Sequence, residues 1–383
     1  MDQKNNSKEA DQVDAVEAHI IKRFNLHKKI GKGAYGVVFK STDKKTKEVV
    51  ALKKLYDAFR NDTDAQRTFR EVMILQELNG HDNIIRLLNV IKAENNMDLY
   101  LVFDYMEADL YNAIRAGILQ DIHKQYILYQ TLKAMKFIHS ADIIHRDLKP
   151  SNIFINSDCQ IKIGDFGLAR TLSSGKNGHS SVVTDYVATR WYRAPEMLLG
   201  SQYYSKSVDM WSMGCILAEL LSGRPLFPGK STKNQIAMVL EITGLPKREE
   251  FLAIREKYLI EIDEKVFPTK LNKKSLKSVV PGASPEALDL MNKLLQFNPD
   301  KRLTVEEALE HKYLEAFHKE DEEMVCDRKI TIPLDDNKKY KMDQYRQKLY
   351  DEILKRKIEI RKKILESIKK KESSKNNLVN VNK

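Results

Sequence analysis

The sequence predicts an α+β fold of two lobes, in which a small strand-rich lobe with one main helix precedes a larger helical lobe. Residues 24–55 have a strand-like pattern around a glycine loop, and residues 100–105 form a further apolar strand. After residue 106 the periodicity becomes mostly helical. A strand-rich part joined to a helix-rich part favours two lobes with a cleft between them.

The elements follow in chain order. The apolar run VVAL at 49–52 is typical of a sheet strand. Residues 62–78 place Phe69, Val72 and Met73 on one side and charges on the other, which predicts an amphipathic helix. In the second lobe the helical spacing is clearest over 125–139, 208–222 and 285–295.

The chain divides into three parts. Residues 1–23 are a polar lead-in, 24–317 form the main domain with lobes at 24–105 and 106–317, and 318–383 are a C-terminal extension. Residues 340–371 lack glycine and proline, and their apolar residues recur at helical intervals, which predicts a long amphipathic helix. These residues are Met342, Tyr345, Leu349, Ile353, Ile358, Leu365 and Ile368. The Asn/Lys-rich end, 373–383, is expected to be disordered.

Composition narrows the class of protein. The chain has 383 residues, 42% of them hydrophobic, and no apolar run long enough to span a membrane. Its N-terminus lacks a signal-peptide pattern, so we expect a reducing compartment. The cysteines, Cys159, Cys215 and Cys326, are too widely spaced for a zinc site and too few for a disulfide framework.

The net charge of +11 is concentrated in the C-terminal extension, where residues 338–372 carry +8. A basic helix of this kind can bind nucleic acid, a membrane or an acidic partner, or can be a solvated surface. Its apolar stripe can pack on the body or on a partner helix, and its charge can serve nuclear import. The sequence does not choose among these alternatives.

A glycine-rich loop at 31–38 has the pattern G-x-G-x-x-G-x-V. Glycines let backbone N–H groups approach phosphate oxygens closely. A dinucleotide-binding loop would lead into a helix, whereas Val37, Val38 and Phe39 continue as a strand. A plain hairpin turn is the other alternative for this segment taken alone.

Lys53 ends the apolar run at 50–52, and a lysine at the end of a buried strand needs a partner. Glu71, on the predicted helix 62–78, is the available carboxylate. The pair would fix the lysine against the α- and β-phosphates of a nucleotide. Two unrelated surface charges are the alternative.

Two motifs give the strongest signal for chemistry. Residues 145–152 read HRDLKPSN and residues 165–167 read DFG, in the order H-R-D-L-x-x-x-N and D-F-G. Asp147 can orient an attacking hydroxyl and accept its proton, and Lys149 can neutralise a phosphoryl group. Asn152 and Asp165 offer the hard oxygen ligands that Mg²⁺ prefers.

Residues 24–317 thus resemble a eukaryotic protein kinase domain that uses ATP and Mg²⁺. The resemblance places Phe103 at the gatekeeper, Met106 at the hinge that meets adenine, and Asp109 at the ribose. It also pairs Arg302 with the glutamate of the motif APE at 194–196 and makes Asp209 a brace of the catalytic loop. The expected nucleotide-binding residues are Gly31, Lys32, Gly33, Ala34, Tyr35, Gly36, Val38, Ala51, Lys53, Glu71, Phe103, Asp104, Met106 and Asp109.

Thr184 and Tyr186 form a T-x-Y motif shortly before ATRWYRAPE at 188–196, which resembles the mitogen-activated protein kinase family. The resemblance implies activation by phosphorylation of both residues. The two phosphates would add a charge of about −3 to −4 at pH 7. Arginine side chains must balance this negative charge. The family's phosphate-pairing arginines correspond to Arg70, Arg146 and Arg170 for phosphothreonine, and to Arg190 and Arg193 for phosphotyrosine.

Residues 342–350 resemble the atypical, seven/eight-like extracellular-signal-regulated kinases, a branch that implies autophosphorylation of the activation loop. The resemblance also implies serine or threonine substrates followed by proline. Docking peptides are expected at the acidic patch Glu320–Glu323, although Lys319 replaces one expected acid. Gly164 departs from the conventional extracellular-signal-regulated kinases, which have cysteine there. We expect a monomer without a nucleic-acid partner, located in the cytoplasm, with the nucleus as an alternative.

Two other functions are alternatives for such a chain. A non-catalytic kinase-fold scaffold commonly lacks the strand lysine or a metal ligand, whereas Lys53, Asp147, Asn152 and Asp165 are all present. A small-molecule kinase would not need the peptide-binding segment WYRAPE at 191–196.

Overall fold

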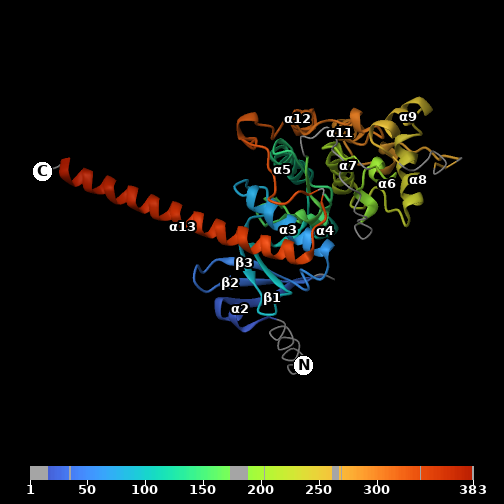
Figure 1. Cartoon of the computed structure of the whole chain (residues 1–383). Coiled ribbons are helices and arrows are strands. Elements are labelled where there is room, and N and C mark those ends of the chain that lie inside the picture. The colour runs from blue at the N-terminus through green and yellow to red at the C-terminus, as the bar shows by residue number, and fades with distance from the viewer. Residues whose placement is uncertain are drawn as a thin grey trace, which may run out of the picture.

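The computed structural model describes residues 16–33, 36–172, 189–201, 203–260, 267–268, 270–336 and 338–381, with side chains through Ile368. Thr184 and Tyr186, and the loop tip Ala34–Tyr35, lie outside the described residues. Figure 1 shows a sheet-containing lobe, a helical lobe, and one long helix that extends beyond the body. The predicted α+β, two-lobed fold is confirmed.

The first lobe is built on a five-stranded antiparallel sheet of order β1-β2-β3-β5-β4. Alternating burial along β2 puts Val37 and Phe39 into one apolar cluster of the lobe, with Val50 and Leu52 of β3. The strands are β1 (Phe24–Gly33), β2 (Gly36–Asp43), β3 (Val49–Leu55), β4 (Leu87–Lys92) and β5 (Leu99–Asp104).

Helix α3 (Asp62–Glu77) lies between this sheet and the rest of the molecule. It begins at Asn61, whose side chain accepts hydrogen bonds from the backbone N–H groups of Thr63 and Asp64 and so caps the helix. The predicted apolar face is buried, with Phe69 and Val72 in the main core.

A short helix, α2 (Ala18–Arg23), lies within the predicted polar lead-in. Ile20 is buried with Val16 and Phe24 against the outer apolar cluster of the sheet. Six residues are too few to show a helical period, and such a short helix depends on tertiary packing for its stability.

The second lobe is helical, and its predicted helices at 125–139, 208–222 and 285–295 are confirmed within α5, α7 and α11. Small strands at the junction carry the candidate site, namely β6 (Ala108–Asp109), β7 (Ile143–Ile144), β8 (Ile153–Ile155), β9 (Ile161–Ile163) and β10 (Arg170–Thr171). The α-helices of this lobe are α4 (Leu110–Arg115), α5 (Asp121–Ser140), α6 (Pro195–Leu198), α7 (Ser207–Ser222), α8 (Thr232–Thr243), α9 (Arg248–Lys257), α10 (Leu276–Val279), α11 (Pro285–Leu294) and α12 (Val305–Leu309). The 3₁₀ turns are η1 (Pro150–Asn152), η2 (Phe166–Leu168), η3 (Arg190–Tyr192), η5 (Pro299–Lys301), η6 (Lys312–Leu314) and η7 (Glu320–Glu322).

The C-terminal extension returns to the first lobe and ends in α13 (Met342–Val381), which packs along α3. Tyr345, Leu349 and Ile353 are buried, whereas Ile358, Leu365 and Ile368 of the same predicted stripe are exposed. The stripe is therefore divided, because the helix outruns the body it packs on (Figure 1).

Helix α13 continues to Val381, into the stretch 373–383 for which disorder is expected, and that expectation stays a prediction. The last stretch contains neither glycine nor proline to stop a helix that is already nucleated. None of the helices among the described residues is long and apolar enough to cross a membrane.

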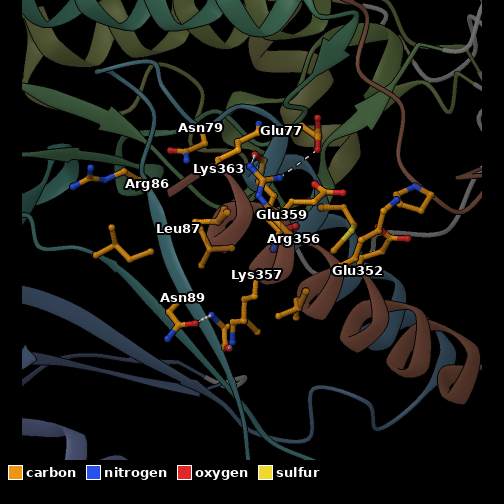
Figure 2. Close-up of a pocket in the computed structure, with 18 of the residues that line it drawn as sticks. Glu77, Asn79, Arg86, Leu87, Asn89, Glu352, Arg356, Lys357, Glu359 and Lys363 are labelled. Carbon is orange, nitrogen blue, oxygen red and sulfur yellow. Dashed lines mark hydrogen bonds and ion pairs between the residues drawn. The ribbon is translucent and has the colours of Figure 1, made fainter. Parts of the chain in front are cut away.

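Where α13 crosses α3 and β4 lies a groove of about 820 Å³, which is also lined by Phe137 of α5 and by residues of the extension between 326 and 333 (Figure 2). Arg356 bridges the helices through Glu77 at 3.3 Å, and it also donates to the backbone carbonyl of Gln76. Lys357 donates to the carbonyl of Val90 on β4 at 3.3 Å. These polar contacts extend the packing one turn beyond the buried Ile353.

Candidate active site

The glycine loop is the hairpin between β1 and β2, with Gly33 opposite Gly36 and Gly31 opposite Val38. A β-carbon on Gly36 would lie 2.1 Å from the carbonyl oxygen of Lys54, so only glycine fits. The loop leads into a strand and not into a helix, which excludes the dinucleotide-binding alternative.

Lys53 lies on β3, next to Val38 of β2 and Leu101 of β5, and its Nζ is 2.9 Å from Glu71 Oε1 of α3. Burial alone would lower the pKa of Lys53, but the carboxylates of Glu71 and Asp165 outweigh that effect and raise it. Lys53 therefore keeps its proton at neutral pH, and the predicted contact with Glu71 is present in the structure.

The catalytic-loop residues converge on one carboxylate. Lys149 Nζ lies 2.7 Å from Asp147 Oδ2, and the side-chain amide of Asn152 donates to the same oxygen at 3.1 Å. The amide also donates to the backbone carbonyl of Asp147 at 2.9 Å. With its nitrogen used in this way, Asn152 has its side-chain oxygen left to offer a cation.

Asp165 has a left-handed backbone conformation, with φ of 58°, at the start of η2. Burial would raise the pKa of its carboxyl, but the positive charges of Lys53 and Lys149 outweigh burial and hold the pKa below its usual range. An ionised carboxylate and the amide oxygen of Asn152 form a donor set that suits Mg²⁺.

A cavity of about 840 Å³ lies beneath the glycine hairpin. It is bounded by the loop glycines, by Lys53 and Glu71, and by Asp165, so the predicted phosphate-handling residues share one space. Sequence reasoning missed Arg67, which also lines it. The signal was present, because Arg67 precedes Glu71 by one helical turn and so shares its face of α3.

The residues predicted to bind adenine and ribose follow one another along β5 and β6. Phe103 is buried and lies opposite Ala51 of β3, and Met106 packs on the core. The Asp104 carboxylate points to Arg86 and Lys162, at 3.0 and 3.4 Å, so its side chain is already paired. Asp109 caps α4 by accepting a hydrogen bond from the N–H of Asn112 at 2.8 Å.

Asp209 of α7 braces the catalytic loop, as the resemblance implies. Its carboxylate accepts hydrogen bonds from the backbone N–H groups of His145 and Arg146, at 2.9 and 2.8 Å. The predicted pair of Arg302 with Glu196 is also confirmed, with two contacts of 2.7 Å between buried side chains.

Two of the three predicted phosphothreonine-pairing arginines contact a carboxylate that sequence reasoning missed. Arg70 and Arg170 meet Asp336 of the C-terminal extension, at 2.8 and 3.7 Å. Arg146 instead donates to the carbonyl of Leu168 at 3.2 Å and lies over the ring of Tyr204. Of the predicted phosphotyrosine pair, Arg190 begins η3 and Arg193 follows that turn.

The acidic patch predicted for docking is only partly available. Glu323 is buried and contacts Lys136 at 3.0 Å and His318 at 2.7 Å. Glu322 contacts Lys319 at 2.8 Å, so the lysine noted in the sequence neutralises one of the acids. The η7 turn still presents Glu320 and Asp321 to solvent.

A fold of two lobes with these motifs at one cleft defines a protein kinase, and the family model of the protein kinase domain matches residues 24–314. The chain is 55% identical over 350 residues to extracellular signal-regulated kinase 2 of Dictyostelium discoideum, covering 91% of this chain and 94% of that protein. It is 52% identical over 362 residues to mitogen-activated protein kinase 15 of Xenopus laevis, covering 94% and 61%. Extracellular signal-regulated kinase 7 of Drosophila melanogaster is 46% identical over 336 residues, with 86% and 36% covered.

The chain belongs to the protein kinase family and, within it, to the mitogen-activated protein kinases that resemble the atypical branch. It is a serine/threonine protein kinase.

Proposed function

We propose that this kinase phosphorylates serine or threonine residues followed by proline, with Asp147 orienting the acceptor hydroxyl and taking its proton. The acceptor oxygen bonds to the γ-phosphorus of ATP as the bond from that phosphorus to the β–γ bridging oxygen breaks. Lys53 holds the α- and β-phosphates, and Lys149 neutralises charge on the transferred group. The ion pair of Lys53 with Glu71, in the cavity that Asp165 also lines, carries the proposal, and the adjoining catalytic loop supplies the Asp147–Lys149 pair.

Asn152 and Asp165 would hold Mg²⁺, which supplies positive charge to the β- and γ-phosphate oxygens. Their fit to the ion rests on donor chemistry, since Asp165 offers an ionised carboxylate and Asn152 an amide oxygen. The backbone N–H of Gly164, directly before Asp165, donates to the backbone carbonyl of Asn152 at 2.9 Å and so joins the two segments.

An oriented peptide-library screen tests catalysis and specificity together. Peptides with Ser-Pro should be phosphorylated in preference to matched Ser-Ala peptides, because a residue without an N–H suits a site with no partner for that donor. Asp147→Asn should lower the rate by at least about a hundredfold. Equal use of Ser-Ala peptides would remove the proline preference alone. No transfer at all by the unmodified chain would favour the scaffold alternative.

Phosphorylation of Thr184 and Tyr186 should raise activity, because two phosphates would engage the arginines assigned to them. The combined variant Thr184→Ala and Tyr186→Phe should be markedly less active than the doubly phosphorylated chain. Full activity of that variant would reject this part of the proposal.

The same loop should be phosphorylated by the chain itself. The chain without substitutions, made in bacteria, should carry phosphate on Thr184 and Tyr186. The Lys53→Arg variant should not, because the substitution disrupts the ion pair with Glu71. Mass spectrometry of both preparations measures the phosphate on Thr184 and Tyr186. Equal amounts in the two preparations would contradict self-phosphorylation.

The remaining expectations concern context. Basic docking peptides would meet Glu320 and Asp321, the acids of the patch that stay exposed. A monomer acting in the cytoplasm, with the nucleus as the alternative, completes the proposal. Size-exclusion chromatography and a tagged chain in cells measure these two points.

A further inference from the structure

Asp336 supplies an anion to the arginine pair beside the active site. Its Oδ1 accepts from Arg70 Nη2 at 2.8 Å and from Arg70 Nε at 3.0 Å, a two-pronged contact with one guanidinium. Its Oδ2 lies 3.7 Å from Arg170 Nε. The side chains of Arg70, Asp336 and Arg170 are 2%, 5% and 7% exposed, so the ion pairs are shielded from water.

Arg70 connects this carboxylate to the catalytic cleft. Its Nη1 donates to the backbone carbonyl of Gly167 at 3.0 Å, in the turn that follows Asp165. Arg70 also immediately precedes Glu71, the α3 partner of Lys53. The guanidinium of Arg70 therefore ties α3 to the turn that follows Asp165, and the next residue of the helix, Glu71, makes the contact with Lys53 of β3.

The extension is anchored so that Asp336 is held in place. The backbone N–H of Met342, at the start of α13, donates to Asp62 Oδ1 of α3 at 2.9 Å. The buried ring of Tyr345 packs on Phe69 with 5.7 Å between ring centres. Asp336 is thus delivered by a segment that is itself bound to α3.

We propose that Asp336 is a positioning residue for phosphoryl transfer: it serves as a built-in counter-charge for Arg70 and Arg170 and holds α3 where Glu71 reaches Lys53. The inference rests on the proposed function, which assigns the same arginines to phosphothreonine. Because the anion belongs to the chain itself, it acts before any modification of the loop. A chain with α3 already in place is competent to phosphorylate its own loop.

The charge, and not only the shape, of Asp336 should matter. Asn has the same size but removes the negative charge that faces the guanidinium groups of Arg70 and Arg170. Repulsion between Arg70 and Arg170 would then push α3 outward and lengthen the contact between Glu71 and Lys53. The expected consequences are weaker nucleotide binding and a more mobile α3.

Nucleotide affinity and hydrogen exchange test this without requiring turnover. In the Thr184→Ala, Tyr186→Phe background, Asp336→Asn should weaken binding of Mg²⁺ with a non-hydrolysable ATP analogue about tenfold, the size of a typical coupling between sites. Amide exchange over 62–77 should increase. The matched control is Asp343→Asn, which removes an exposed carboxylate from the same extension and should change neither quantity.

Two further arms separate positioning from general folding. Asp336→Glu should restore affinity to within about threefold, since it keeps the charge. In chain phosphorylated on Thr184, the loss caused by Asp336→Asn should shrink, because phosphate offers the arginines a second anion. Unchanged affinity and exchange in Asp336→Asn, or an equal loss in Asp336→Glu, would overturn the proposal. Because neither readout needs phosphate transfer, failure of the proposed substrate specificity leaves this result interpretable.

Discussion

Gly164 directly precedes Asp165, and a large neighbouring side chain leaves little room for anything bigger than glycine at this position. A β-carbon at this position would lie 2.6 Å from Cε2 of Phe154, on the adjacent strand β8, and 3.2 Å from Cγ2 of Ile85. The departure from the cysteine of conventional kinases is therefore matched by an aromatic side chain that fills the space. The turn that begins at Asp165 is supported by this packing.

We predict that Gly164→Cys destabilises the chain by about 1–3 kcal/mol, the usual cost of overpacking. Urea denaturation measures it. Adding Phe154→Leu should recover part of the loss, because the smaller side chain vacates the space that the thiol needs. Additive losses in the double variant would show that Phe154 is not the source of the constraint.

His81 should make the fold sensitive to mild acid. The ring is buried, Nδ1 accepts a hydrogen bond from the N–H of Asn83 at 3.0 Å, and burial with the charge of Lys133 lowers its pKa to about 4. In the unfolded chain His81 binds a proton near pH 6.5, whereas in the folded chain it does so only near pH 4. Between these two pH values the folded chain therefore holds fewer protons than the unfolded chain. The contribution of His81 to the free energy of unfolding is fully present above pH 6.5 and falls by about 1 kcal/mol per pH unit toward pH 4.

His81→Asn should flatten the profile of unfolding free energy between pH 6.5 and 4.5. Asn has no proton to gain, and its side-chain oxygen can still accept from Asn83. His27→Asn, at an exposed position, is the control and should keep the parental slope. Identical slopes for the parent and His81→Asn would refute the assignment.

At the scale of elements, α13 contributes stability through only part of its apolar stripe. Leu349 is fully buried against the body, whereas Leu354 is 61% exposed. Leu349→Ala should cost about 2–5 kcal/mol, from lost burial and the cavity left behind. Leu354→Ala should stay within about 0.5 kcal/mol of the parent. Equal effects in chemical denaturation would mean that α13 does not dock as described.

Local spacing predicted some of these elements and failed for others. The motifs at 145–152 and 165–167 needed only order and spacing, so their residues could be placed before any coordinates. The helical period of 340–371 predicted α13, but it runs unchanged past the point where the body ends. Which turns are buried depends on the size of the lobe, and that is not encoded in the helix itself.

Asp336 could not be found in this way. Its partner Arg70 is 266 residues distant, and the extension holds other acids of the same kind. Only the packing of Tyr345 and Met342 on α3 selects this carboxylate for the arginines. Ion pairs between distant segments follow from the fold, whereas catalytic motifs are largely recognised from the order and spacing of neighbouring residues.

At the scale of the molecule, the catalytic domain and its extension form one structure. The family model ends at residue 314, yet the chain that follows contacts α3 and the arginines next to the cleft. The basic charge gathered in 338–372 is therefore carried on an element that is partly structural. The exposed residues that follow Lys357, such as Ile358, Leu365 and Ile368, lie beyond these contacts of α13 with the body.

Two truncations distinguish these portions. Removing 338–383 keeps Asp336 but deletes Tyr345, Leu349 and Ile353, so the apolar surface of α3 around Phe69 becomes exposed. We expect a melting temperature several degrees lower and weaker binding of the ATP analogue, because α3 loses its outer support. Removing only 369–383 should leave both values at those of the full chain.

The short truncation also bears on the charge of α13, since it removes Lys369, Lys370 and Lys371 and keeps the buried Tyr345, Leu349 and Ile353. If the tagged short form changes its location in cells while its melting temperature and nucleotide affinity stay constant, the end of the helix acts as an address or a binding surface. If the chain without 338–383 were as stable as the full chain and bound the ATP analogue as tightly, the extension would be independent of the domain. The docking of α13 on α3 would then contribute neither to stability nor to nucleotide binding.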